Sequence, residues 1–188
     1  IIFGKWIQYG LWWPDKQLRL FRRGQGRFPE KHVHEYIAVD GATADLNNFM
    51  IHYNYESVSQ YLRKLDTIYT ENEVSNLLAA NYQVSWQDVI RFPVSDFLKV
   101  YFAQEGYKDG LHGLVLAIFQ SFYSFVVFAK LWETKGFVQV EVTESALERE
   151  ISDASRQGTY WRRTRRRNES LNPLSRFFYR FMRKYVSL

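Results

Sequence analysis

The stretch from Leu111 to Ala129 contains no Asp, Glu, Lys or Arg, and it constrains the fold more than any other feature of the sequence. It is about as long as a membrane-spanning helix, which needs ~20 predominantly apolar residues. However, Gln120, Ser121 and Ser124 place polar groups along it, and glycines stand near its start. These residues favour a helix that is buried in a protein core or lies at a membrane interface.

Composition narrows the class of protein. A chain of 188 residues is long enough for one domain with a core but short for two. Its 46% of apolar residues exclude a disordered chain, and its 18% of aromatic residues exceed what a compact core requires. The formal charge of +5 suggests an anionic partner, and the absence of cysteine excludes disulfides and thiolate zinc sites. Because Ile1 is not a Met and no signal-peptide pattern follows it, we expect a processed chain or a part of a longer one.

The spacing of apolar residues changes near Glu56. Before it, short β-favouring runs predict strands over residues 17–22, 36–39 and 48–53. After it, helical spacing predicts helices over residues 58–80, 88–101, 111–129 and 144–156 and from Leu174 onward, with a break at Pro93, an N-cap at Ser95 and a loop at "EGYKDGLHG". We therefore predict an α+β fold, in which a strand-rich part (1–55) is followed by a helical part (56–137) and a basic helical tail (138–188).

A basic loop leads into a histidine–glutamate pair. Arg19, Arg22 and Arg23 precede a stretch with Gly and Pro, and His34 and Glu35 follow it. Transfer of a group from an anionic leaving group requires such residue types, because a carboxylate can accept a proton from an incoming hydroxyl and cations can stabilise the departing phosphate. By residue type alone, a structural or surface pair is the better explanation of the histidine and glutamate, and arginines also keep a strand edge polar.

Several motifs follow one another in an order that resembles a known family. They are "WWPDKQLRLFRRGQGRF", "VHE", "DG", "MIHYNY", "YLRKLDTIYT" and "GYKDGLHGLVLAIFQSFYSFVVFAKLWE". Over about residues 3–137 this series resembles the latter half of bacterial glycosyltransferases of family 2, the group that includes lipopolysaccharide-core enzymes. The resemblance implies a GT-A fold, in which a nucleotide-binding α/β half precedes an acceptor-binding half, and sugar transfer with inversion of configuration.

The resemblance also implies roles for individual residues. Glu35 falls where the family has its catalytic base, usually an aspartate. His52 falls where many such enzymes have a histidine that completes the site of a divalent ion, Mg²⁺ or Mn²⁺, although a structural histidine at a strand end is the alternative. The residues expected at the donor diphosphate are Arg19, Arg22 and Arg23. The residues expected near the donor or acceptor sugar are Trp12, Trp13, Asp15 and His34.

The family's first half has no counterpart in this sequence, which contains neither an Asp-x-Asp motif nor a glycine-rich phosphate loop. We therefore expect the C-terminal portion of an enzyme, inactive without its nucleotide-binding half. The resemblance implies a nucleotide-sugar donor, in the first instance a UDP-sugar, and a glycan or lipid-linked acceptor as partners.

The C-terminal tail suggests attachment to a membrane. Phe177, Phe178 and Phe181 share one apolar helical face, and Arg163 and Arg166 belong to a basic run just before it. Such a helix lies in the interface of an anionic membrane surface, or it docks on its own domain. We expect a cytoplasmic protein that is peripheral on the inner face of a bacterial cell membrane.

Two other functions remain open at this point. A nucleic-acid-binding module would account for "WRRTRRR", but the arginines form one block and no RNP, KH or zinc-finger pattern is present, so we expect no nucleic-acid partner. A membrane-bound scaffold without chemistry would account for the apolar stretch and the basic tail as well as an enzyme does.

Overall fold

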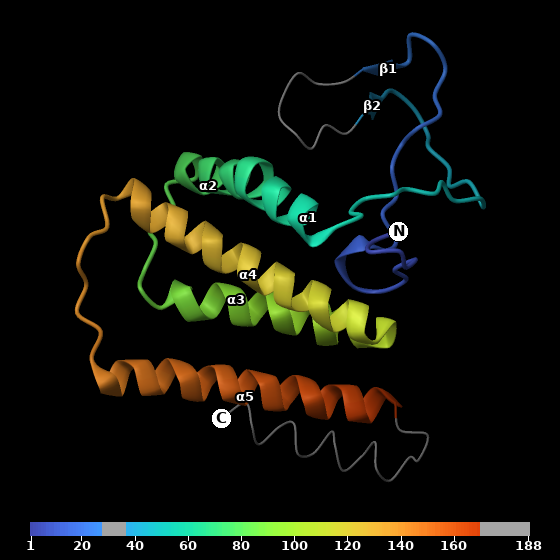
Figure 1. The fold of residues 1–188 in the computed structure, drawn as a ribbon. Coiled ribbons are helices and arrows are strands. Elements are labelled where there is room, and N and C mark those ends of the chain that lie inside the picture. The colour runs from blue at the N-terminus through green and yellow to red at the C-terminus, as the bar shows by residue number, and fades with distance from the viewer. Residues whose placement is uncertain (28–36, 170–188) are drawn as a thin grey trace.

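The computed structural model describes residues 1–27 and 37–169, and its centre is the long helix α4 (Leu111–Thr134) (Figure 1). Helix α3 (Asp88–Leu98) packs along one side of α4, while α1 (Val58–Lys64) and α2 (Thr70–Ala79) pack along another. Helix α5 (Glu144–Glu169) packs on α3 and lies farther from α4. The apolar stretch of the sequence therefore forms the helix around which the others assemble.

Helix α1 begins at a capped N-terminus. The Ser57 side chain accepts a hydrogen bond from the backbone N–H of Gln60, and the Gln60 side chain accepts one from the backbone N–H of Glu56. Reciprocal bonds of this kind satisfy donors that the start of a helix leaves open. A π-helical segment, η2 (Leu65–Tyr69), joins α1 to α2. Across this segment the Thr70 hydroxyl donates a hydrogen bond to the Leu65 carbonyl at 2.9 Å. The helix predicted over residues 58–80 is confirmed.

Helix α3 corrects two predictions. It runs continuously through Pro93, so both the break at Pro93 and the N-cap at Ser95 are wrong. A proline within a helix costs free energy because it removes a backbone hydrogen bond, and the packing of α3 along α4 offsets this cost. In this contact the Ser121 hydroxyl donates to the Pro93 carbonyl at 2.9 Å. At the start of the helix, the Asp88 side chain accepts a bond from the backbone N–H of Ser85 at 2.8 Å. A π-helical segment, η3 (Lys99–Ala103), and a 3₁₀ helix, η4 (Gly106–Asp109), then lead to α4.

Helices α4 and α5 are longer than predicted. Helix α4 extends to Thr134, and α5 continues through the arginine run to Glu169 instead of ending at Arg156. Ion pairs one turn apart, Arg156 with Asp153 and Arg165 with Glu169, favour the helical backbone over the basic stretch. The helix predicted from Leu174 lies outside the described residues.

Two short antiparallel strands complete the α+β fold in the described residues. Strand β1 (Gly26–Arg27) pairs with β2 (Ala38–Val39), and this confirms part of the strand predicted over residues 36–39. The strands predicted over residues 17–22 and 48–53 are not formed. A strand requires a neighbouring strand for the ladder of bonds between backbone N–H and C=O groups, and within the described residues neither segment pairs with one.

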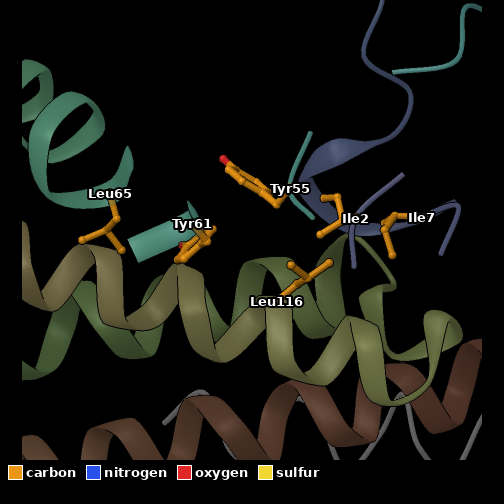
Figure 2. Close-up of a cluster of buried hydrophobic side chains, with 6 residues drawn as sticks. All are labelled: Ile2, Ile7, Tyr55, Tyr61, Leu65 and Leu116. Carbon is orange, nitrogen blue, oxygen red and sulfur yellow. The ribbon is translucent and has the colours of Figure 1, made fainter. Parts of the chain in front are cut away.

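The main core joins the N-terminal segment to the helices (Figure 2). Its buried side chains are Ile2, Ile7, Tyr55, Tyr61, Leu65 and Leu116. The ring of Tyr61 stacks on that of Phe119 with 4.6 Å between centroids, and its hydroxyl donates to the Phe119 carbonyl. A second cluster, formed by Val74, Val127 and Leu131, lies where α2 meets α4. Both clusters use α4, so this helix connects the N-terminal segment to the rest of the fold.

Candidate functional site

Asp109 fixes the N-terminal segment to the helical part of the chain. Its carboxylate accepts hydrogen bonds from the backbone N–H groups of Gln8 and Tyr9 at 3.0 and 2.9 Å, and it lies 3.2 Å from the Lys5 ammonium group. The Asp109 side chain is 4% exposed, so water competes little for these bonds. Hydrogen bonds to an ionised acceptor are roughly twice as strong as neutral ones. We call this arrangement of Lys5, Gln8, Tyr9 and Asp109 the Asp109 clasp.

The glycines of "GYKDGLHG" allow the close packing beside the clasp. Gly110 precedes α4 with a φ of +66°, a conformation that favours glycine. A Cβ atom on Gly113 would lie 1.7 Å from the backbone oxygen of Gly106, so no side chain fits there. The predicted loop is therefore a compact 3₁₀ turn packed directly on the first turn of α4.

Three exposed aromatic rings gather on and beside the clasped segment. The ring of Trp6 lies 5.5 Å from that of Trp13 and 5.1 Å from that of Phe49, and the last two are 5.8 Å apart between centroids. Their exposed fractions run from 37% for Trp13 to 62% for Phe49. Contacts at these distances stabilise the rings against one another. This aromatic triad of Trp6, Trp13 and Phe49 therefore offers an apolar surface to a ligand.

The structure separates the two adjacent tryptophans that were predicted to contact sugar. Trp13 belongs to the aromatic triad, whereas Trp12 packs against the main core and ends the 3₁₀ helix η1 (Gly10–Trp12). Asp15 is exposed and accepts a hydrogen bond from the Gln17 side chain at 2.7 Å. Trp13 and Asp15 thus lie on the accessible side of this segment.

Sequence reasoning missed Trp6, Phe49 and Asp109. Phe49 carries no signal that relates it to a tryptophan more than 30 residues earlier, because the three rings meet only after the chain has folded. Asp109 could have been noticed as the acidic residue between the glycines of a quoted motif.

The arginines predicted to bind a diphosphate lie between Trp13 and β1 in the sequence. Arg19, Arg22 and Arg23 are exposed, so an anionic ligand can reach their guanidinium groups. The chain turns at Gly24, which has a φ of +81°, and the backbone N–H of Gln25 donates to the Arg22 carbonyl at 3.0 Å. The arginines and Trp13 therefore belong to one largely exposed segment, residues 13–23.

His52 is exposed, and no metal site forms around it in the described residues. Its backbone carbonyl accepts a hydrogen bond from the backbone nitrogen of Ile1 at 2.6 Å. Among residues 1–27 and 37–169, no group of three or more His, Asp or Glu side chains is placed to hold a metal ion. One imidazole is not a complete site for a divalent ion, so the described residues do not fit the expected metal by themselves.

Several predicted site residues lie outside the described part of the chain. These are His34, Glu35, Phe177, Phe178 and Phe181. The strands β1 and β2 flank the segment that contains His34 and Glu35, because Arg27 is paired with Ala38.

The arginine run of α5 lies next to the start of α4. Arg163 and Arg166 belong to α5, and between them Arg165 places its guanidinium carbon 4.0 Å from the centre of the Tyr107 ring. Tyr107 belongs to η4, which immediately precedes α4. The basic residues therefore lie close to one end of the long apolar helix (Figure 1).

The segment between residues 20 and 53 exposes many large apolar side chains. They are Leu20, Phe21, Leu46, Phe49, Met50, Ile51 and Tyr53. Single exposed apolar residues are ordinary, whereas larger exposed apolar patches mark interaction sites.

Comparison with known proteins finds a distant glycosyltransferase relative. Over 120 residues the chain is 25% identical to the lipopolysaccharide core biosynthesis glycosyltransferase LpsC of Rhizobium meliloti (strain 1021). The match covers 63% of this chain and 44% of that protein, so the chain spans less than half the length of the curated relative. No family model matches the chain, and no solved structure matches it.

Proposed function

We propose that this chain is the C-terminal portion of an inverting glycosyltransferase of the cell envelope. It would transfer a sugar from a nucleotide-sugar donor, in the first instance a UDP-sugar, to a hydroxyl group of a glycan or lipid-linked acceptor. The observation that carries the proposal is the similarity over 120 residues to a lipopolysaccharide core glycosyltransferase. The structure supports it in one respect: a motif of the ordered series builds the Asp109 clasp, which holds the segment of the aromatic triad.

In this proposal the aromatic triad stacks on a sugar ring. The apolar faces of sugars pack on exposed indole and phenyl rings, and the polar edges remain free for hydrogen bonds. Asp15 lies two residues from Trp13 and would accept hydrogen bonds from sugar hydroxyl groups. Trp12 is not part of this surface, because it packs on the core.

Glu35 and the arginines would carry the chemistry. The Glu35 carboxylate accepts the proton of the acceptor hydroxyl, while the oxygen of that hydroxyl forms a bond to the anomeric carbon and the bond from this carbon to the diphosphate breaks. Arg19, Arg22 and Arg23 stabilise the charge on the departing nucleoside diphosphate. A positioned base contributes about 10²–10⁴-fold to such a reaction. His34, beside the base, would contact the acceptor.

The nucleotide pocket would come from polypeptide that precedes this chain in the complete enzyme. That half would cover the exposed apolar residues between 20 and 53 and offer strand partners to the segments over 17–22 and 48–53. For the divalent ion, Mg²⁺ or Mn²⁺, we propose only that His52 is one ligand, because the described residues supply no others.

We also propose that the enzyme is cytoplasmic and peripheral on the inner face of the cell membrane. The run with Arg163 and Arg166 would meet anionic lipid, where each cation gains about 1 kcal/mol. A lipid-linked acceptor would then share a surface with the enzyme.

The test uses the longest natural polypeptide that contains this chain. Incubation with a panel of nucleotide-sugars and a truncated lipopolysaccharide should add one sugar to the acceptor, detected by mass spectrometry. Trp13→Ala should slow the transfer by about tenfold through the acceptor or donor KM, and Trp161→Ala on α5 is the matched control. Transfer that is unaffected by Trp13→Ala would remove the triad from the proposed site.

A further inference from the structure

One face of α4 is apolar and exposed from Leu111 to Trp132, and the exposed Glu133 follows at its C-terminal end. Its exposed side chains are Leu111, Ile118, Phe122, Phe125 and Trp132. Residues seven apart lie on the same side of a helix, so Leu111, Ile118, Phe125 and Trp132 fall on one line, and Phe122 lies beside it. At 1.5 Å per residue this line is about 30 Å long. We call these five residues the α4 face.

The α4 face is unusual for the central helix of a bundle. Among the described residues, α4 is the one helix that is long and apolar enough to cross a membrane by length and composition. Only 28% of its most apolar stretch is buried inside the chain, and the remaining residues are half-buried or exposed. An exposed apolar surface of this extent marks a contact with another apolar body.

The other sides of α4 carry polar contacts that disfavour a spanning position. The Gln120 and Ser124 side chains donate to the Asp96 carboxylate of α3, and the Lys130 ammonium group forms ion pairs with Asp66 and Glu71. If α4 spanned a membrane, the Asp96 carboxylate beside its middle would lie within the hydrocarbon, which is costly. The helix therefore presents only one face to an apolar environment.

The apolar surface continues past the end of α4. The ring of Phe137 lies 5.0 Å from that of Trp132, and Val138 accepts a hydrogen bond from the Trp132 indole through its backbone carbonyl. Phe137 and Val138 are themselves exposed. At the opposite end, the Arg165–Tyr107 contact brings the arginine run close to Leu111. An apolar stripe with a tryptophan at one end and cations at the other complements the interface of an anionic bilayer.

We propose that the α4 face inserts into the headgroup and acyl boundary of an anionic lipid bilayer, with the helix lying parallel to the membrane plane. The occupant of this face is lipid, and neither a second copy of the chain nor another protein. The inference goes beyond attachment through the basic C-terminal tail, because it assigns the contact to a described helix of the folded chain, and it does not depend on transferase activity.

The test is flotation of the 188-residue chain with vesicles, either of phosphatidylcholine alone or with an equal amount of phosphatidylglycerol. Phe125→Glu places a charge on the α4 face, and Leu78→Glu places one on α2 at a residue of similar exposure, 41% against 43%. We expect Phe125→Glu to lower recovery with anionic vesicles by about tenfold, while Leu78→Glu floats like the unchanged chain. Matching circular dichroism spectra and melting temperatures establish that both variants fold.

Salt separates the two parts of the interaction. At 0.5 M salt the contribution of the arginines is screened, whereas the difference between Phe125→Glu and Leu78→Glu persists because it arises from apolar contact. Equal flotation of the two variants would overturn the proposal. A second result would also overturn it: light scattering shows that the unchanged chain is a dimer and Phe125→Glu a monomer, and neither chain floats. The α4 face would then bind a second copy of the chain.

Discussion

The carboxylate of Asp109 accepts a hydrogen bond from the backbone N–H of Tyr9 at 2.9 Å, although 100 residues separate them in the sequence. The same carboxylate accepts a bond from Gln8 and pairs with Lys5, so one buried side chain determines where the segment with Trp6 lies. The position of the aromatic triad therefore depends on a buried residue that is not part of the triad.

Replacement of Asp109 should destabilise the fold. In Asp109→Ala the N–H groups of Gln8 and Tyr9 lose their acceptor in a poorly solvated region, and we expect the free energy of unfolding to fall by about 3 kcal/mol. Urea denaturation measures it. Asp45→Ala is the control, because it removes the exposed ion pair with Lys16 and should cost less than about 1 kcal/mol. Equal losses in the two variants would contradict the clasp.

A methyl group at Gly113 should be poorly tolerated. The added Cβ would meet the backbone oxygen of Gly106, and backbone cannot move aside cheaply, so we expect Gly113→Ala to lower the free energy of unfolding by about 2 kcal/mol or more. Gly158→Ala, within α5 and with open space around its Cβ, should raise it by about 0.5–1 kcal/mol. Thermal denaturation of both variants measures these changes. A Gly113→Ala variant as stable as the unchanged chain would argue against the close packing of Gly113 on Gly106.

Alkaline pH should destabilise the protein through its buried tyrosines. Burial raises the pKa of the Tyr55, Tyr61 and Tyr123 hydroxyls above their ordinary value of about 10. Below pH 10 both the folded and the unfolded chain keep these protons, so the contribution of the buried tyrosines to the free energy of unfolding is fully present. Above it the unfolded chain releases them first, and stability falls as the pH rises toward the folded pKa values.

Absorbance at 295 nm, recorded together with circular dichroism from pH 8 to 12, follows this alkaline transition. We expect these tyrosines to ionise only as the helices unfold, and Tyr61→Phe to make the loss of stability with pH less steep. Complete tyrosine ionisation in a chain that keeps its helical spectrum would show that burial does not hold their protons.

His52 gives a test of the metal proposal. Because histidine is a common metal ligand, we expect His52→Ala in the complete enzyme to raise the Mn²⁺ dissociation constant, measured by calorimetry. His112→Ala is the control, since that ring contacts the Phe3 carbonyl at 3.3 Å. An unchanged dissociation constant would return His52 to a structural role.

Helices could be predicted better than strands, for a physical reason. The apolar stripe with Tyr61 and Leu65 is a local pattern, and a helix satisfies its own backbone groups. The segments over 17–22 and 48–53 have the composition of strands, but strand pairing depends on a partner that the sequence cannot supply locally. Pro93 shows the reverse case, in which tertiary packing overrides a local signal.

The candidate site could be predicted only in part. Trp13, Asp15 and the arginines were predicted because they share one short motif, and the structure shows that they are exposed, while their roles stay predictions. Trp6 and Phe49 contact Trp13 only in the folded chain, where the Asp109 clasp holds the segment with Trp6. No spacing of residues in the sequence predicts this contact.

The most direct test of the proposed function is the turnover of Glu35→Gln in the complete enzyme. This change keeps the size of the side chain and removes its proton acceptor, so we expect kcat to fall by about two orders of magnitude or more while the donor Kd changes by less than about twofold. Glu30→Gln, in the same segment, should retain activity. Transfer by Glu35→Gln at a rate near that of the unchanged enzyme would contradict the account.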